Sequence, residues 1–330
     1  MANTQNPRLG RLSLLGATLI WGSSFIILKS TLNSVPTLWV LAFRFTGAAL
    51  LMALIGWKEL RSFSSEYLRK GLGLGAALFT AYTLQTFGLE YTTPGKNAFL
   101  TATYCVIVPF MWWFFTKKRP DRYNIAAALI CICGMALVSL DGSLSLGLGD
   151  GLTICCGFFY ALHIILTAKA VEGRSPVLLS MVQFAVAGLL CWIAAPFVSA
   201  FPQNVPSSAW WSIAYLCFMC TGICFLLQTI GQKHTSPQTA SIILTLESVF
   251  GTLLSIIFYH EQLSLKTAMG FVLIFAAVLI SETNLPAGAA AAFRLPVGTA
   301  DGSAQLHQRL GEVTGFFWIN GGKPFPDACL

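Results

Sequence analysis

Charged side chains are scarce in this chain of 330 residues, since Asp, Glu, Lys and Arg together make up only 10%. Soluble domains usually carry about 25% charged residues. Hydrophobic residues make up 55% of the chain, and its mean hydropathy is +0.71. This composition excludes an ordinary soluble domain and indicates an integral membrane protein whose first partner is the lipid bilayer.

Acidic residues are the scarcer of the two charged classes. The chain has 13 Asp and Glu against 20 Lys and Arg, which gives a formal net charge of +7. The cytoplasmic loops of membrane proteins are enriched in Lys and Arg, and this enrichment is enough to explain the excess. We therefore expect no nucleic-acid partner.

The chain also lacks the motifs of well-known catalytic sites. It contains no His-Glu-x-x-His, no P-loop, no paired catalytic carboxylates and no nucleophile elbow. Nine of its ten cysteines lie in apolar stretches, where Cys behaves as a small apolar residue. Cys217, Cys220 and Cys224 share one helical face, but a metal site would need a fourth ligand at a similar depth. We expect no catalytic residues, no metal and no cofactor.

Apolar segments long enough to cross a bilayer recur along the chain. A helix needs about 20 apolar residues for this, and proline falls in or beside many of the short connections, where its missing N–H does no harm. The expected fold is an all-α polytopic membrane protein with ten transmembrane helices. The ten segments are 11–29, 37–56, 71–90, 97–116, 122–140, 149–168, 177–200, 209–230, 237–259 and 264–282.

Basic residues are distributed unevenly among the connections between these segments. If the N-terminus lies inside, sixteen of the twenty Lys and Arg fall on the inner side and three on the outer side, and Arg44 lies within a helix. Such a bias orients membrane proteins with the basic side in the cytoplasm. We therefore expect both termini to be cytoplasmic.

A repeat divides the chain into two halves. The tripeptide Leu-Gln-Thr at 84–86 recurs at 227–229, and the Gly, Thr and Pro that follow it recur at the same offset of 143 positions. Each half holds five segments, an odd number, so the second half must enter the membrane from the opposite side. We expect two inverted five-helix repeats, at 11–141 and 149–282. Chance similarity between two apolar stretches is the alternative.

Two terminal regions lie outside the repeats. Residues 1–10 are expected to form a cytoplasmic N-terminal segment. Residues 283–330 are rich in Gly, Ala and Pro and have no long apolar period. We expect them to form a poorly ordered cytoplasmic tail.

Several short motifs occur in a fixed order along the apolar segments. They are Trp-Gly-Ser-Ser-Phe at 21–25, Phe-Arg-Phe at 43–45, the polar stretch at 85–93, Gly-Lys-Asn-Ala-Phe-Leu-Thr at 95–101, Leu-Glu-Ser-Val-Phe at 246–250 and His-Glu-Gln-Leu at 260–263. Together they resemble the EamA-type transporters of the drug/metabolite transporter superfamily. The resemblance implies a bacterial inner-membrane carrier that exports metabolites, amino acids or toxic compounds. The chain departs from the family pattern at Ser248, where proline is common.

Arg44 is the sharpest candidate for a functional residue. It lies eight residues into its segment, and Arg at a helix centre costs roughly 2.5–3.5 kcal/mol on insertion scales. Its side chain should therefore face protein or a water-filled cavity. It could bind an anionic group of a substrate, or it could lock neighbouring helices through hydrogen bonds.

Glu247 and His163 are further ionisable residues within apolar segments. Glu247 is the only acidic residue well inside one, and the offset of 143 pairs it with Tyr104, so both are candidates for contact with a ligand. Glu247 could also carry a proton during transport, and the alternative is a fixed ion pair or a hydrogen bond between helices. His163 is a candidate proton relay, although a buried neutral His is the more common case.

Polar side chains form stripes on two neighbouring segments. The first stripe consists of Tyr82, Thr83, Thr86 and Glu90, and the second of Asn97, Thr101 and Tyr104. Each stripe falls on one face of a helix with 3.6 residues per turn. A polar stripe in a membrane helix must face away from lipid, so we expect it to line a substrate pathway or to bond neighbouring helices.

These features favour a secondary transporter. We expect it to export a small metabolite, amino acid or drug-like compound across the inner (plasma) membrane by alternating access, with the substrate bound between the repeats. Protons as the coupling ion are a separate hypothesis. An integral-membrane enzyme acting on a lipid-linked substrate would need clustered catalytic groups. A passive facilitator channel would need filter-like segments.

Overall fold

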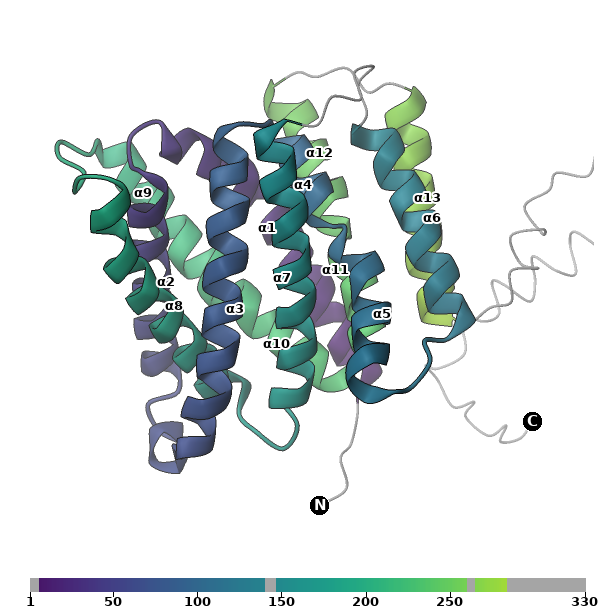
Figure 1. Cartoon of the computed structure of the whole chain (residues 1–330), viewed down its shortest axis with the longest axis horizontal. Helices are drawn as coiled ribbons and strands as arrows, with labels where there is room; N and C mark the ends of the chain where they lie inside the picture. Colours follow the sequence, from purple (N-terminus) through teal and green to yellow (C-terminus); the bar gives the residue numbers. More distant parts are fainter. Residues whose placement is uncertain (1–5, 140–146, 260–264, 284–330) are drawn as a thin grey trace, which may run out of the picture. The chain divides into compact units, whose positions relative to one another are not determined.

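The computed structural model describes residues 6–139, 147–259 and 265–283. Within these ranges every element of secondary structure is a helix (Figure 1), which confirms the expected all-α class. The expected N-terminal segment is described from Asn6 onward. The expected tail lies outside the described residues, apart from Thr283.

The helices follow the apolar segments closely. The first half contains α1 (Pro7–Leu32), α2 (Thr37–Ile55), η1 (Glu59–Ser62), α3 (Ser65–Glu90), α4 (Pro94–Thr101), α5 (Tyr104–Thr116) and α6 (Arg122–Ser139). The second half contains α7 (Leu148–Ala170), α8 (Pro176–Val198), α9 (Ser207–Tyr215), η2 (Leu216–Ile223), α10 (Cys224–His234), α11 (Pro237–Leu244), α12 (Leu246–Tyr259) and α13 (Leu265–Thr283). η1 is a 3₁₀ helix and η2 is a π-helix that joins α9 to α10 without a break.

Several helices start where the sequence supplies a cap. α1, α8 and α11 begin at a proline, whose missing N–H is harmless in the first turn. The side chains of Asn6, Ser175 and Ser236 precede these prolines, and each accepts a hydrogen bond from a backbone N–H of the first turn. Local sequence therefore fixes these starts independently of packing.

Among the described residues, seven helical stretches are long and apolar enough to cross a membrane. They are Pro7–Leu32, Thr37–Ile55, Ser65–Glu90, Asn97–Thr116, Leu148–Ala170, Pro176–Val198 and Ser207–His234. The expected count of ten is not confirmed. Shorter apolar helices lie in the segments expected at 122–140 and 264–282, and the segment at 237–259 is divided between α11 and α12.

Two of the expected segments are interrupted at matching places. α4 ends at Thr101 and α5 begins at Tyr104, while α11 ends at Leu244 and α12 begins at Leu246. Threonine hydroxyls at both breaks bond carbonyls three residues back: Thr103 Oγ1 lies 2.7 Å from Leu100 O, and Thr245 Oγ1 lies 2.6 Å from Ile242 O. Such side-chain bonds compete with the regular helical ladder.

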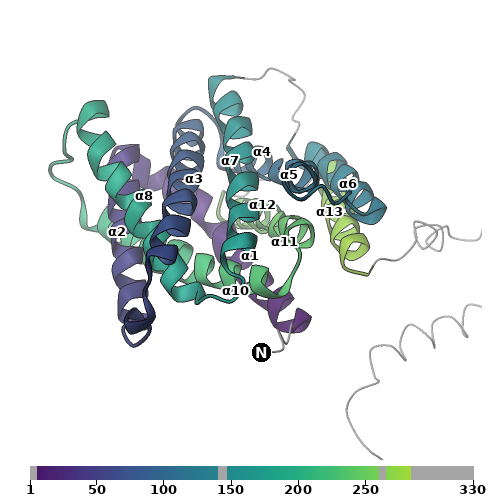
Figure 2. The same cartoon turned by 60° about the horizontal axis from the view of Figure 1, so that its bottom comes forward.

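The two halves of the chain interlock. α1 packs against α10 and α12, α3 against α7 and α8, and α6 against α13 (Figure 2). Glycines bring some of these helices close together. A Cβ at Gly75 of α3 would lie 2.5 Å from Val186 Cβ of α8, and a Cβ at Gly134 of α6 would lie 2.8 Å from the carbonyl of Gly270 in α13. Small residues at helix contacts are typical of membrane bundles.

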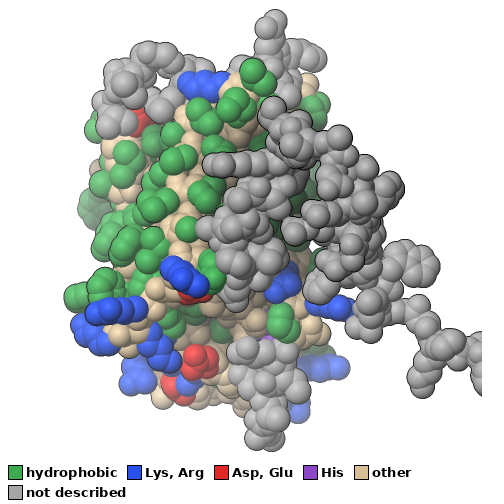
Figure 3. Space-filling model, turned by 90° about the vertical axis from the view of Figure 1, so that its right-hand side faces the viewer, with side chains coloured by type: hydrophobic (Ala, Val, Ile, Leu, Met, Phe, Trp, Pro, Cys, Tyr) green, Lys and Arg blue, Asp and Glu red, His purple; other side chains and the backbone are tan. Residues whose placement is uncertain are grey.

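The surface has the composition of a lipid-facing protein. Many large apolar side chains are exposed, among them Phe197 at 88% and Leu54 at 72%. On the face seen in Figure 3, hydrophobic side chains form a band, and Lys and Arg gather below it. An apolar band bordered by basic residues fits a protein that sits in a bilayer.

Candidate functional site

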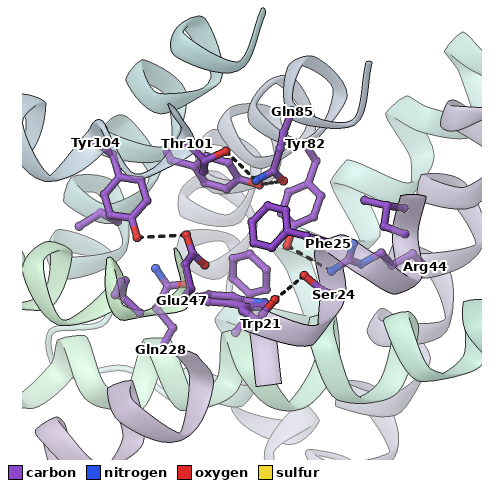
Figure 4. Close-up of a pocket in the computed structure, with 15 residues that line it drawn as sticks. Trp21, Ser24, Phe25, Arg44, Tyr82, Gln85, Thr101, Tyr104, Gln228 and Glu247 are labelled. Carbon is purple, nitrogen blue, oxygen red and sulfur yellow. Dashed lines mark hydrogen bonds between the residues drawn. The ribbon is translucent and has the colours of Figure 1, made fainter. Parts of the chain in front are cut away.

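A cavity lies among the helices of both halves (Figure 4). The space open to the centre of a water molecule is about 40 Å³, enough for a few waters at roughly 10–15 Å³ each. In this conformation the cavity is therefore too small for a metabolite. Fifteen residues line it: Trp21, Ser24, Phe25, Leu28, Arg44, Tyr82, Gln85, Thr101, Tyr104, Tyr160, Ile164, Phe225, Gln228, Leu244 and Glu247.

Aromatic rings supply much of the cavity wall. Tyr160 of α7 meets Tyr82 at 5.6 Å and Tyr104 at 6.4 Å between ring centroids. Phe225 of α10 meets Trp21 of α1 at 4.9 Å. Most of these rings meet edge to face, which is a favourable geometry for aromatic pairs. The wall therefore offers an apolar surface to any ligand.

Arg44 of α2 brings a buried positive charge to the cavity, with its side chain only 1% exposed. Its Nε donates a hydrogen bond to Thr221 Oγ1. Its guanidinium carbon lies 4.8 Å from the centre of the Tyr82 ring, and Nη2 lies 3.4 Å from the Tyr82 hydroxyl. No carboxylate of the described residues lies within 4.0 Å of this guanidinium. Arg44 thus has polar and aromatic neighbours but no anionic partner there.

The acceptor for Arg44 depends on the π-helix. Thr221 lies in η2 and donates its own hydroxyl to Leu216 O at 2.8 Å, five residues back. The lone pairs of the hydroxyl then remain available for Arg44 Nε. Single turns of π-helix inside α-helices frequently occur at functional sites.

Glu247 and Tyr104 both line the cavity, and a hydrogen bond joins their side chains. Tyr104 is the first residue of α5, and its hydroxyl donates to Glu247 Oε1 at 3.3 Å (Figure 4). Glu247 is the second residue of α12, and both side chains are buried. The two breaks in the helices therefore present the carboxyl group and the hydroxyl to the same space.

Gln85 and Gln228 occupy matching positions but have different surroundings. Gln85 Nε2 donates to Thr101 Oγ1 at 3.1 Å, and its Oε1 accepts from the Tyr160 hydroxyl at 2.7 Å. The oxygen of Gln228 is buried and has no hydrogen-bond partner among the described residues. Gln85 is thus held by the protein, whereas Gln228 keeps an acceptor available to a ligand or water.

Ten of the fifteen lining residues form pairs that are separated by 143 positions. The pairs are Trp21 with Ile164, Tyr82 with Phe225, Gln85 with Gln228, Thr101 with Leu244, and Tyr104 with Glu247. Equivalent positions of the two halves therefore build most of the wall.

Five candidates from the sequence come together at the cavity. They are Arg44, Tyr82, Thr101, Tyr104 and Glu247. Exposing a charge to lipid is costly, which is why Arg44 and Glu247 were expected inside the protein. Both side chains are buried.

The other five candidates do not line the cavity. Thr83 and Thr86 lie on α3 with buried hydroxyls that have no partner among the described residues. Glu90 is exposed at the end of α3, where it accepts a hydrogen bond from Thr37. Asn97 is buried, and its Nδ2 donates to Gln85 O at 3.1 Å and to Thr153 Oγ1 at 2.8 Å.

His163 is the fifth candidate outside the cavity wall. It is 1% exposed, and its Nε2 lies 2.8 Å from Gln183 Oε1 of α8. Its Nδ1 is buried without a partner in the described part of the chain. The side chain joins α7 to α8 beside the cavity.

Most of the apolar and amide residues of the cavity were not among the candidates predicted from the sequence. Gln85 and Gln228 carried a signal, because both belong to the repeated Leu-Gln-Thr tripeptide. Trp21 begins the Trp-Gly-Ser-Ser-Phe motif at 21–25. Phe225 carried no signal, since aromatic residues are common throughout the chain and suit membrane interfaces as well.

Comparison with known proteins identifies the family. Residues 8–140 and 147–283 both match the EamA-like transporter family. The chain belongs to this family. The two matches divide the chain almost where the internal repeat does, and they confirm the resemblance to EamA-type transporters. The family and the apolar helices together make the chain a multi-pass membrane protein of a transporter family.

Relatives from other organisms carry similar names. A protein of Archaeoglobus fulgidus, named as an uncharacterized transporter, is 30% identical over 272 residues, which cover 82% of this chain and 84% of the relative. The uncharacterized transporter YetK of Bacillus subtilis is 22% identical over 286 residues, which cover 82% of this chain and 85% of YetK. Both alignments extend through most of the two halves.

A solved crystal structure shares the fold. It superposes with a TM-score of 0.68 at 17% sequence identity and covers 83% of this chain and 96% of the solved one. At this level of identity the likeness concerns the arrangement of the helices alone.

Proposed function

We propose that this family member is a secondary transporter that exports a small metabolite, amino acid or drug-like compound across the bacterial inner membrane. The observation that carries the proposal is the central cavity, in which Arg44 and Glu247 lie buried inside apolar helices. Ionisable residues at such depth are costly, and they commonly mark a substrate or ion pathway.

The proposed topology has ten crossings arranged as two inverted five-helix repeats, at 11–141 and 149–282, with both termini in the cytoplasm. The matching bounds of α4 and α11 support this arrangement. Both helices begin at a proline, and α11 begins and ends 143 positions after α4. Interrupted helices at corresponding positions of two repeats are typical of the substrate sites of transporters.

Alternating access would require the cavity to open. The space of about 40 Å³ accommodates only water, so a substrate must enter when helices move apart. The breaks at 102–103 and at 245 are natural hinges, because the regular backbone ladder is already interrupted there. Rocking of one repeat against the other would then expose the cavity to each side in turn.

The lining favours an amphipathic substrate. The guanidinium of Arg44 suits an acidic group, and the oxygens of Glu247 and Gln228 suit a hydrogen-bond donor or a cationic group. The aromatic wall between them suits an apolar portion. Candidates outside the wall would contact the substrate on its route: Thr83, Thr86, Glu90, Asn97 and His163.

Transport by purified protein tests the proposal. We expect liposomes that contain the chain to show saturable flux and counterflow of at least one compound from a panel of amino acids, their analogues and amphipathic toxins. Arg44→Gln should abolish this flux, and the matched change Glu172→Gln, at an exposed position in a loop, should preserve it. Flux no greater than in empty liposomes for every compound would refute the proposal. Flux without counterflow would favour a channel.

Proton coupling is a separate part of the proposal and concerns Glu247. A carboxyl group in the cavity could take up a proton on one side and release it on the other. We expect an imposed pH gradient to drive flux in the wild-type protein. Glu247→Gln cannot exchange a proton, so gradient-driven flux that persists in this variant would exclude the role.

A further inference from the structure

A second hollow lies between α5 and α7 and shares no lining residue with the central cavity. Its volume, measured in the same way, is about 570 Å³, and only apolar side chains line it. Phe110 and Phe114 of α5 and Phe158 of α7 contribute to the wall and are half-exposed or more, with Phe114 at 70%. The hollow is therefore an apolar groove on the outside of the helices, and we call it the α5–α7 groove.

The ammonium groups of two lysines lie over aromatic rings that line the α5–α7 groove. Lys169, near the end of α7, places Nζ 4.9 Å from the centre of the Phe115 ring. Lys117, directly after α5, places Nζ 4.9 Å from the centre of the Phe114 ring. Phe114 and Phe115 both line the groove. Both ammonium groups thus lie beside the groove where the two helices end.

No described carboxylate lies within 4.0 Å of either lysine. Lys117 also adopts the left-handed conformation, with φ at 57°, and its N–H bonds Trp113 O at 2.8 Å to close the helix. Glycine is the usual residue at this kind of helix end. The chain instead places a lysine there, followed by Lys118 and Arg119. Positive charge is therefore concentrated at one end of an apolar groove.

We propose that the α5–α7 groove binds an anionic phospholipid, with one acyl chain between α5 and α7 and the phosphate beside Lys117 and Lys169. The groove supplies the apolar contact that an acyl chain needs, and basic residues close to a membrane attract anionic headgroups. Lysine binds phosphate as a point charge without demanding a particular geometry. The site is independent of the transported substrate, because none of its residues lines the central cavity.

Native mass spectrometry of the full chain in detergent tests this site. The protein is titrated with phosphatidylglycerol and with phosphatidylcholine of identical acyl chains. We expect the first bound phosphatidylglycerol to be retained about tenfold more strongly than phosphatidylcholine, and the double variant Lys117→Gln/Lys169→Gln to lose this preference. An unchanged preference in the double variant, or none in the wild type, would overturn the proposal.

Lys58→Gln is the matched control. Its Nζ also lies over an aromatic ring, 5.5 Å from the centre of Trp57, but neither residue lines the groove. We expect this variant to bind phosphatidylglycerol as the wild type does. An equal loss in Lys58→Gln would indicate diffuse attraction to basic loops and would overturn the assignment to the α5–α7 groove.

Two further measurements separate the lipid from other occupants. Leu162→Trp adds volume to the groove wall and should weaken the first bound lipid even with both lysines intact. Inorganic phosphate at millimolar concentration should not displace the lipid, and full displacement would reduce the site to an anion site. A dimer mass that disappears in Leu162→Trp and is independent of lipid would overturn the proposal in favour of a second copy of this chain.

Discussion

α4 and α11 occupy matching places in the two halves of the chain, and each runs for eight residues from a proline to a break. The side chains at the two breaks differ. The first half presents Thr101 and Tyr104 to the cavity, where the second half presents Leu244 and Glu247. The backbone plan has been kept in both halves while the chemistry has diverged.

This difference has a consequence for binding. Equivalent backbones would allow each half to move in the same way, as the proposed alternating access requires. Different side chains make the ends of the cavity distinct, since Arg44 comes from the first half and Glu247 from the second. A bound molecule could therefore have only one favourable orientation.

Among the matched positions of the two halves, a change at the Tyr104 and Glu247 pair should have the largest effect. We expect Glu247→Gln to lower transport in liposomes more than about tenfold and to remove its dependence on a pH gradient, because the carboxyl group is lost. Tyr104→Phe removes only the hydroxyl that donates to Glu247. We expect transport to fall about threefold, because one hydrogen bond is lost. Equal effects of the two changes would show that the pair acts symmetrically.

The matched glutamines should respond differently to the same substitution. Gln85→Leu removes the acceptor of the Tyr160 hydroxyl and one of the two partners of the Thr101 hydroxyl, so we expect the free energy of unfolding to fall by about 2–3 kcal/mol. Gln228→Leu removes an oxygen that has no partner in the described structure, and stability should change by less than about 0.5 kcal/mol. Unfolding in mixed micelles measures both. A larger loss for Gln228→Leu would contradict the comparison.

The close contact between α3 and α8 involves a glycine that the second half lacks at the matching position. Gly75 is followed 143 positions later by Phe218, so only the first half has a glycine there. Gly75→Ala would place a Cβ 2.5 Å from Val186 Cβ, and we expect a loss of about 1–2 kcal/mol from overpacking.

Gly73→Ala is the control on the same helix, because a Cβ there meets nothing within 4 Å. Thermal unfolding of this variant should match the wild type or improve slightly, since alanine favours a helix over glycine. If both alanine variants unfold alike, close packing at Gly75 is not what holds α3 against α8.

A smaller effect than that of Gly75→Ala is expected at the second break. Thr245→Ala introduces alanine, the residue that the first half has at the matching position, Ala102. The change removes a hydroxyl that donates to Ile242 O and lies 3.3 Å from Cys131 Sγ, which should cost about 0.5–1 kcal/mol. The break should survive, because the first half is interrupted with alanine at that position. Transport reduced as strongly as in Glu247→Gln would show that the hydroxyl itself is needed.

Much of the fold could be predicted from apolar length, because a segment that avoids water must form its own backbone hydrogen bonds. The interruptions of α4–α5 and α11–α12 were not predicted, since a threonine whose hydroxyl bonds a carbonyl three residues back looks like any other threonine in a sequence. The helical arc that joined Asn97 to Tyr104 assumed one continuous helix. Thr101 and Tyr104 lie on either side of the break and both line the cavity, whereas Asn97, one turn before Thr101 in α4, bonds α3 and α7.

The sequence by itself determined that this chain is a helical membrane protein with a repeated plan, because composition and segment length depend only on the cost of moving each residue from water to lipid. Only the tertiary structure decided which polar groups meet. The contact between Arg44 and Thr221 joins α2 to a π-helix 177 residues away, and the contact between Tyr104 and Glu247 joins two helix breaks. Such meetings depend on how helices of both halves pack, which no local pattern encodes.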